Sequence, residues 1–188
     1  LKNSNKICEL NISNFNNENC KYTTLKRSSL IDFLKKDLEK EIKFDHTISK
    51  IEQQDQIVKI AFENNEAYEF DYLIISDGVF SKSKNLLSKN KIQPKYDDTL
   101  AIRGIIPSSS NIADKKNISL FLGSNFHYVI YPVSPDGDLN FIAVMKYQLS
   151  EDEQKDYSLF KDDNFISKIL EKVPHLNKEF FDNINDLK

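Results

Sequence analysis

Apolar residues recur with helical spacing between residues 27 and 40. A helix over this range would place charged residues on one face and four apolar residues on the other, namely Leu30, Ile31, Leu34 and Leu38. The pattern therefore predicts an amphipathic helix, with Ser28 or Ser29 as its N-terminal cap. Closer to the start of the chain, the alternation at residues 6–12 predicts one short strand in an otherwise irregular segment.

A small antiparallel meander is predicted after this helix. Residues 47–53 and 56–64 alternate apolar with polar side chains, as the strands of a half-buried sheet do. The Asn-Asn pair at residues 64–65 is typical of a turn, and a third short strand is expected at residues 67–70. The three strands would follow one another directly.

The next apolar run has a different pattern. Residues 71–76 are largely apolar without alternation, which is typical of a strand buried on both faces in the middle of a parallel sheet. We expect this strand to end at Asp77 and Gly78, with a short helix over residues 81–88 behind them. The carboxyl end of such a strand is where open α/β sheets bind ligands. The alternative is an ordinary strand-to-helix turn with Asp77 as a cap, which local features alone favour.

The second half of the chain is predicted to form a sheet of four strands, at residues 101–107, 118–123, 126–133 and 139–147. The segment Ser134-Pro135-Asp136-Gly137 between the last two has the residues of a tight turn, so these strands should form a hairpin. Helices are expected at residues 157–173 and 175–184, separated by a proline.

The composition of the chain argues against several classes of function. The 188 residues carry 26 basic and 29 acidic side chains, a net charge of −3, which does not suit a nucleic-acid coat. No apolar run is long enough to span a bilayer, and no export signal opens the chain, so we expect a cytoplasmic protein. Two cysteines and three scattered histidines give no metal-binding motif, so no metal site is expected. The four glycines are too scattered for a glycine-rich phosphate loop.

The order of elements resembles the middle of the single-component FAD-dependent aromatic hydroxylases, which include salicylate hydroxylase and the ubiquinone-biosynthesis hydroxylases. The residues that carry the resemblance begin with Arg27, Leu30 and Leu34 and continue with Ser76, Asp77, Gly78, Ser81 and Lys84. Arg103-Gly104 and the segment at residues 122–133 are similar to two later strands of the family. The resemblance covers about residues 20–185.

This resemblance implies an α/β (α+β) fold: a fragment of a FAD/NAD(P)-binding, Rossmann-like domain joined to a mixed, mainly antiparallel substrate-binding sheet with helices. We expect the partial FAD-binding domain at residues 1–94 and the substrate-binding sheet with its helices at residues 95–188. The chain begins at Leu1 and lacks the family's glycine-rich loop and its later Gly-Asp segment. It is therefore expected to be an internal part of a longer enzyme and to bind FAD weakly or not at all by itself.

The sequence departs from the family pattern at three positions. Ile75 and Ser76 stand where the family has Gly-Ala before Asp-Gly, and Lys84 stands where it has Arg. Lys keeps the positive charge of Arg but lacks the planar group that binds an anion with two parallel hydrogen bonds.

The implied reaction is the hydroxylation of an aromatic, phenolic ring with O₂ and NAD(P)H, with FAD as the cofactor. Four residues are implied to bind the cofactor: Arg27, Ile48 through its backbone, Asp77 and Gly78. Candidates for the substrate pocket are Arg103, His127, Tyr131, Phe141 and Met145. For Arg103 the alternatives are a substrate carboxylate and a structural ion pair, and the alternative for the aromatic candidates is a place in the core, which is more common for a stripe of aromatic residues. No catalytic residue is assigned.

Two other functions remain open at this point. The chain can belong to a related flavin-dependent reductase or halogenase, or it can be a non-catalytic binding module. The expected partner is a small aromatic molecule; neither nucleic acid nor a transmembrane segment is expected. Peripheral contact with a membrane is an option only for a polyprenylated substrate, and the sequence does not indicate an oligomeric state.

Overall fold

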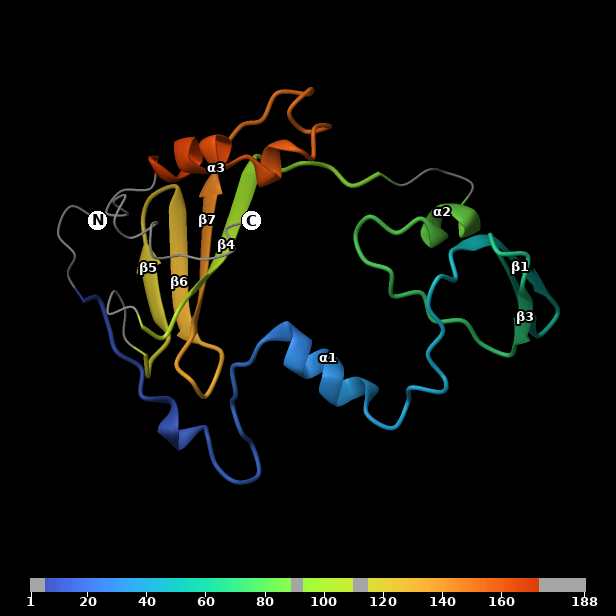
Figure 1. The fold of residues 1–188 in the computed structure, drawn as a ribbon, viewed down its shortest axis with the longest axis horizontal. Helices are drawn as coiled ribbons and strands as arrows, with labels where there is room; N and C mark the ends of the chain where they lie inside the picture. Colours follow the sequence, from blue (N-terminus) through green and yellow to red (C-terminus); the bar gives the residue numbers. More distant parts are fainter. Residues whose placement is uncertain (1–5, 89–92, 110–114, 173–188) are drawn as a thin grey trace. The chain divides into compact units, whose positions relative to one another are not determined.

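The computed structural model describes residues 6–88, 93–109 and 115–172 (Figure 1). The chain divides into two compact units, Leu34–Tyr96 and the pair Leu1–Phe33 with Asp97–Lys188, as far as these ranges are described. The division at Tyr96 lies next to the expected boundary between residues 94 and 95. The first 33 residues belong to the same unit as the second half of the chain. One contact that joins them is a hydrogen bond from Thr24 Oγ1 to the carbonyl of Pro132.

The larger unit contains a four-stranded antiparallel sheet, which confirms the expected strands (Figure 1). Its strand order is β4-β7-β6-β5, and the bounds are β4 Thr99–Ile106, β5 Ser119–Leu122, β6 Phe126–Pro132 and β7 Leu139–Lys146. The predicted tight turn joins β6 to β7. Gly137 adopts a φ of +90° there, and its N–H donates to the carbonyl of Ser134 at 3.1 Å.

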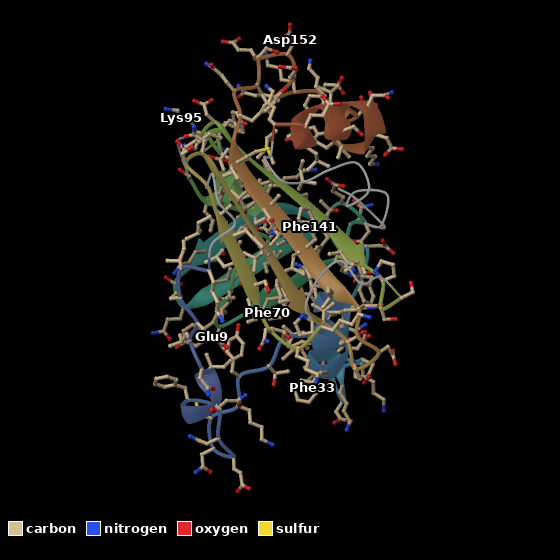
Figure 2. The ribbon with its side chains drawn as sticks, turned by 90° about the vertical axis from the view of Figure 1, so that its left-hand side faces the viewer. Glu9, Phe33, Phe70, Lys95, Phe141 and Asp152 are labelled. Atoms are coloured by element: carbon tan, nitrogen blue, oxygen red, sulfur yellow. The ribbon has the colours of Figure 1, made fainter. Side chains whose placement is uncertain are left out.

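One face of this sheet forms the main core. Alternate residues of β7 are at most 4% exposed, which are Leu139, Phe141, Ala143 and Met145. The register places Ile102 of β4 and Tyr128 of β6 on either side of Ala143, so the buried residues of three strands share this face. Phe141 is fully buried and lies in the middle of the sheet (Figure 2).

Helix α3, Asp163–Leu170, adds four buried side chains to the core of the larger unit: Phe165, Ile166, Ile169 and Leu170. The helix is shorter than the predicted range of 157–173. A 3-10 turn, η2 at Leu159–Lys161, precedes it, and Asp162 is extended and caps α3 by accepting from the N–H of Asn164 at 2.8 Å. The second predicted helix, at residues 175–184, lies outside the described residues.

The smaller unit contains the predicted meander. Its strands are β1 Ile48–Gln54, β2 Ile57–Phe62 and β3 Ala67–Phe70, in the order β1-β2-β3 and antiparallel throughout. Asp55 and Asn65 take positive φ angles in the two turns, as short polar side chains tolerate. The short helix α2, Ser83–Leu87, is also present and contacts β1 (Figure 1).

The amphipathic helix is shorter than expected. Helix α1 spans Arg27–Lys35 and does not extend to residue 40, because Asp37 adopts a left-handed φ of 68° two residues later. Ser28 and Ser29 lie inside the helix and do not cap it. None of its side chains is buried, so its apolar face has no cover among the described residues.

Two predicted strands are wrong. Residues 71–76 are not paired in any sheet, and Tyr72 and Ile74 are 89% and 87% exposed. A parallel strand exists only through hydrogen bonds to neighbouring strands, and the described residues supply no parallel partner. Residues 6–11 form no strand either, and they lead into a 3-10 turn, η1 at Ile12–Asn14, capped by the side chain of Asn11.

Candidate functional site

The loop between residues 77 and 84 in the smaller unit is the first candidate site. Asp77 Oδ2 accepts a hydrogen bond from the N–H of Ser83 at 3.3 Å, at the first residue of α2. The N–H of Lys84 donates to Ser81 Oγ at 3.0 Å, and Lys84 Nζ donates to the carbonyl of Val79 at 2.8 Å. Asp77 thus contacts the start of the helix, although the N-cap residue of α2 is Lys82 and residues 71–76 before the turn form no strand, so the alternative of a strand-to-helix turn capped by Asp77 is not formed as expected.

These contacts also keep Asp77 charged. Hydrogen bonds from Ser81, and secondarily from Ser83, lower the pKa of the Asp77 carboxyl below its ordinary value. The carboxylate is exposed. It can therefore accept further hydrogen bonds from a ligand.

Gly78 provides the open part of this loop. Its φ is +83°, and a Cβ built on it would meet no atom within 4 Å. Gly78 lines a wide hollow of about 420 Å³ together with Ile75, Asp77, Ser81, Lys84, Leu87 and Ser88. A ligand can therefore approach the backbone at Gly78 closely, which a side chain would prevent.

The other two cofactor candidates lie elsewhere. Ile48 begins β1, which is an edge strand among the described residues, so one side of its backbone is open to a partner. Arg27 begins α1 in the larger unit; it is exposed, and its side chain makes no hydrogen bond or ion pair within the described ranges. The structure brings Ile48 and Asp77–Gly78 together in one unit and describes Arg27 in the other. Their roles in binding stay predictions.

The second candidate site is the open face of the four-stranded sheet. In the register of the strands, Arg103 of β4 lies beside Ile142 of β7, which lies beside Val129 of β6. Strand alternation places His127 and Tyr131 on the same face as Val129. Neighbouring strands are about 4.8 Å apart, so β4 and β6 are separated by roughly 10 Å, a width that suits an aromatic ring.

Strand alternation separates the five substrate candidates into two groups. Arg103 and His127 are exposed and Tyr131 is half-buried, all on the open face. Phe141 and Met145 are 0% and 4% exposed on the core face. Their burial makes both of them core residues of this unit. For Phe141 this is the alternative to the substrate pocket that the sequence left open. A role in substrate binding remains an untested prediction for each of the five.

Arg103 is the most informative residue of the open face. Its side chain makes no hydrogen bond, ion pair or ring contact within the described ranges, so the structural ion pair considered from the sequence is not formed there. Lys146, a cation on the same face, has its Nζ 3.9 Å from the Asp97 carboxylate and donates to the Asp97 carbonyl at 3.4 Å. Within the described residues, Arg103 is thus an available cation beside the half-buried Ile142.

Sequence reasoning missed Asn140. It lies between Ile105 and Tyr131 across the sheet, on the open face, and is half-buried. Alternation in β7 was the available signal, because Asn140 has the same parity as Ile142 and is a polar residue on that face.

Over the ranges that the structure covers, no three His, Cys, Asp or Glu side chains gather as they would around a metal ion. Within those ranges, no helix combines the length and the apolar character needed to cross a bilayer.

No protein-family model matches the chain, and no curated protein matches it. Solved structures do. HpxO from Klebsiella pneumoniae, complexed with FAD and uric acid, is 18% identical over 66% of this chain and 32% of its own, with a TM-score of 0.59. A salicylate hydroxylase substrate complex is 20% identical over 66% of this chain and 36% of its own, with a TM-score of 0.54.

The tetracycline destructase Tet(55) is 18% identical over 86% of this chain and 43% of its own, with a TM-score of 0.54. The chain therefore spans between about a third and two fifths of these proteins. At these identities the likeness concerns the fold. The chain has the fold of one part of the FAD-dependent hydroxylases, as the resemblance in its sequence implied.

Proposed function

We propose that this chain is part of a FAD-dependent monooxygenase that hydroxylates an aromatic substrate with NAD(P)H and O₂. The shared fold supports this proposal, and the single observation that carries it is the open sheet face. That face combines a cation, Arg103, whose side chain has no partner among the described residues, with apolar neighbours and the polar side chains of Tyr131 and His127.

The chemistry of this face favours an aromatic substrate with a carboxylate or a similar anionic group. A guanidinium group can bind a carboxylate with two parallel hydrogen bonds. Ile142 lies next to Arg103 in the sheet and Val129 lies beyond it on β6, and the two side chains offer the apolar surface that the ring needs. Tyr131 and His127 can donate to or accept from a ring hydroxyl.

The loop at Gly78 fits a cofactor that approaches the backbone closely. The space beside Gly78 is open, and the charged carboxylate of Asp77 accepts hydrogen bonds from hydroxyl groups such as those of a sugar or ribityl chain. We propose that Asp77, Gly78, the backbone of Ile48 and Arg27 hold FAD. When bound, FAD supplies the redox chemistry that couples NAD(P)H to O₂, and this chain contributes binding, orientation and exclusion of water.

The test uses the protein produced from its complete coding sequence. We expect it to purify with flavin absorbance, and we expect an aromatic carboxylate to stimulate both NAD(P)H oxidation and O₂ consumption. Equal NAD(P)H oxidation without O₂ would indicate a reductase, and a requirement for halide would indicate a halogenase. A protein that shows no flavin absorbance after addition of FAD would contradict the proposal. The remaining interpretation would then be a non-catalytic binding module.

A further inference from the structure

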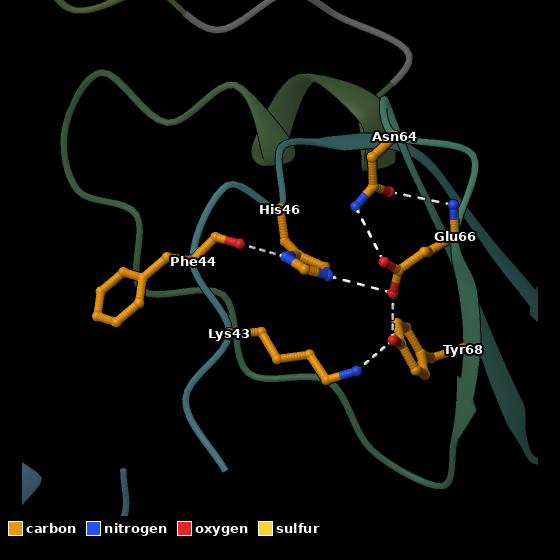
Figure 3. Close-up of polar contacts among 6 residues, drawn as sticks. All are labelled: Lys43, Phe44, His46, Asn64, Glu66 and Tyr68. Carbon is orange, nitrogen blue, oxygen red and sulfur yellow. Dashed lines mark hydrogen bonds and ion pairs between the residues drawn. The ribbon is translucent and has the colours of Figure 1, made fainter. Parts of the chain in front are cut away.

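A chain of polar contacts outside both candidate sites links the segment before β1 to the turn between β2 and β3 (Figure 3). We call it the His46 clasp and define it by Lys43, His46, Glu66 and Tyr68. His46 Nε2 lies 3.3 Å from Glu66 Oε2, and His46 Nδ1 lies 2.5 Å from the carbonyl oxygen of Phe44. All of these residues belong to the smaller unit.

The geometry defines the protonation state of His46. Both ring nitrogens face oxygen atoms that can only accept, a backbone carbonyl and a carboxylate. A neutral imidazole has one N–H donor and one lone pair, so it can satisfy only one of these contacts. Both contacts form together only when His46 carries two protons and a positive charge.

Glu66 is held in its charged form at the centre of the clasp. The hydroxyl of Tyr68 and the imidazole of His46 donate to one carboxylate oxygen, and Asn64 Nδ2 donates to the other at 3.3 Å. These bonds, first that of Tyr68 and then that of His46, lower the pKa of Glu66. Lys43 Nζ completes the chain by donating to the hydroxyl of Tyr68.

The groups around His46 act on it in opposite directions. The carbonyl of Phe44 and then the carboxylate of Glu66 raise the pKa of His46, whereas partial burial and the charge of Lys43 lower it. The ring of Phe62 on β2 contacts the imidazole edge to face, with the ring centroids 5.0 Å apart, and the ring of Tyr68 on β3 lies at 6.5 Å. The net effect is a raised pKa for His46.

We propose that His46 is a proton-dependent clasp, which joins residues 43–47 to the β2–β3 turn when it is protonated and releases that turn when it is neutral. This inference does not depend on the proposed function. The clasp acts on the chain immediately before Ile48, where β1 begins.

The contact with Glu66 should open first. The bond to the carbonyl of Phe44 is the shorter of the two, so the one remaining proton should stay on Nδ1. The lone pair of Nε2 would then face the carboxylate, which retains Tyr68 and Asn64 as donors. Loss of this contact would loosen the neighbouring bond from the N–H of Glu63 to the carbonyl of Thr47, now 2.9 Å long.

The direction of the pH effect follows from linkage. Because folding raises the pKa of His46, the clasp contributes stability that is fully present below about pH 6.5, the ordinary histidine pKa. That contribution is lost as the pH rises through the raised pKa of the folded protein. The clasp is therefore closed in mildly acidic conditions and opens on the alkaline side of this window.

The first measurement is a ¹⁵N NMR titration of the histidine rings in the complete chain. We expect both nitrogens of His46 to be protonated at pH 6, a titration above the ordinary value of 6.5, and a neutral form with its proton on Nδ1. Titration of His46 at or below the ordinary value, or a neutral form protonated on Nε2, would overturn the proposal.

The second measurement uses a matched pair of variants. Glu66→Gln removes the carboxylate of the clasp. Glu69→Gln removes a nearby carboxylate on β3 that does not belong to the clasp, because Glu69 Oε1 pairs with Lys59 Nζ at 2.9 Å. We expect E66Q to lower the pKa of His46 clearly more than E69Q does. Equal shifts would show that only the net charge matters and would contradict the clasp. If E66Q does not fold, Glu66→Asp replaces it, because it keeps the charge but shortens the side chain, so the contact with His46 Nε2 should lengthen and the pKa of His46 should fall.

Hydrogen exchange provides a readout of the opening itself. In the unmodified chain, the protection factor of the Glu63 amide, corrected for intrinsic exchange, should fall several-fold as the pH rises through the titration of His46. In His46→Gln, which cannot gain the proton, the protection factor should not change over the same range. A pH-independent protection factor in the unmodified chain would refute the opening step.

Discussion

Lys26 Nζ donates to Asp138 Oδ2 at 3.0 Å, although the two residues are 112 positions apart in the sequence. Asp138 Oδ1 also accepts from the N–H of Ser108 at 3.1 Å, and the N–H of Asp138 donates to Ser134 Oγ at 3.1 Å. One aspartate thus joins the residue before α1, the end of β4 and the β6–β7 turn. These contacts tie the residue before α1 to the four-stranded sheet.

This junction predicts a graded response to substitution at Asp138. Asp138→Asn keeps an acceptor for Ser108 but loses the charge that faces Lys26, so the melting temperature should fall by no more than about 2 °C. Asp138→Ala also leaves the N–H of Ser108 without its acceptor and should lower the melting temperature further. The control is Asp136→Asn in the same turn, whose side chain is exposed. Equal melting temperatures for all three variants would show that the junction does not stabilise the unit.

The same residue predicts an acid dependence. Hydrogen bonds from Lys26 and then from Ser108 lower the pKa of Asp138 in the folded chain. Its contribution to stability is therefore present above the ordinary aspartate pKa of about 3.9 and is lost as the pH falls through the lower folded value. Denaturant unfolding at a series of pH values should show this loss in the unmodified chain and a smaller loss in D138N.

Gly78 and Gly137 form a matched pair for testing the cofactor loop. Both have positive φ, +83° and +90°, so alanine at either position should cost about 1 to 2 kcal/mol of stability. A Cβ at Gly137 would make only ordinary contacts, the nearest at 3.6 Å to Ser108. In the whole protein, Gly78→Ala should also weaken FAD binding, by roughly ten-fold or more, because the Cβ occupies the space that the cofactor needs.

Flavin titrations of G78A and G137A at matched concentrations would measure this difference. Equal FAD affinity in the two variants would mean that the cofactor does not approach the backbone at Gly78.

Phe141 is predicted to support the fold and not the substrate. Its side chain is fully buried in the core, so Phe141→Ala should destabilise the chain by about 3 to 5 kcal/mol in denaturant unfolding. Phe33→Ala, at a side chain that is 73% exposed, should change stability by less than about 0.5 kcal/mol. An F141A chain of ordinary stability with an altered substrate range would instead place Phe141 in the pocket.

Arg103 is predicted to select the charge of the substrate. In the whole protein, Arg103→Met should raise the KM for an aromatic carboxylate by roughly ten-fold or more, because a buried or half-buried carboxylate would lose its partner. The KM for the matching uncharged phenol should change much less. Lys146→Met removes a cation from the same sheet face that already pairs with Asp97, and it is the control for net charge.

Steady-state kinetics with the two substrates and the two variants separate these effects. A similar rise in KM for the acid and the phenol in R103M, or an equal effect of K146M, would contradict a direct contact between Arg103 and the substrate.

Local patterns were sufficient for every antiparallel strand in the later half of the chain and in the meander. Alternation fixes which side chains share a face, and the Ser134–Gly137 segment has the residues that its turn requires. Most of these strands hydrogen-bond to the next strand along the chain, so their partners lie in the same stretch of sequence. β4 is the exception, because it pairs with β7, and no local pattern predicts that long-range pairing.

The sequence by itself thus determined the strands of the two antiparallel sheets, the turn at Gly137, the position of α2 and the resemblance to flavin hydroxylases. The tertiary structure alone decided that residues 71–76 are unpaired, because a parallel strand depends on partners that no local pattern supplies. It also decided which face of the four-stranded sheet is covered, and so separated Arg103, His127 and Tyr131 from Phe141 and Met145. Alternation gives two faces to every strand, and only packing against the rest of the chain determines which of them becomes the core.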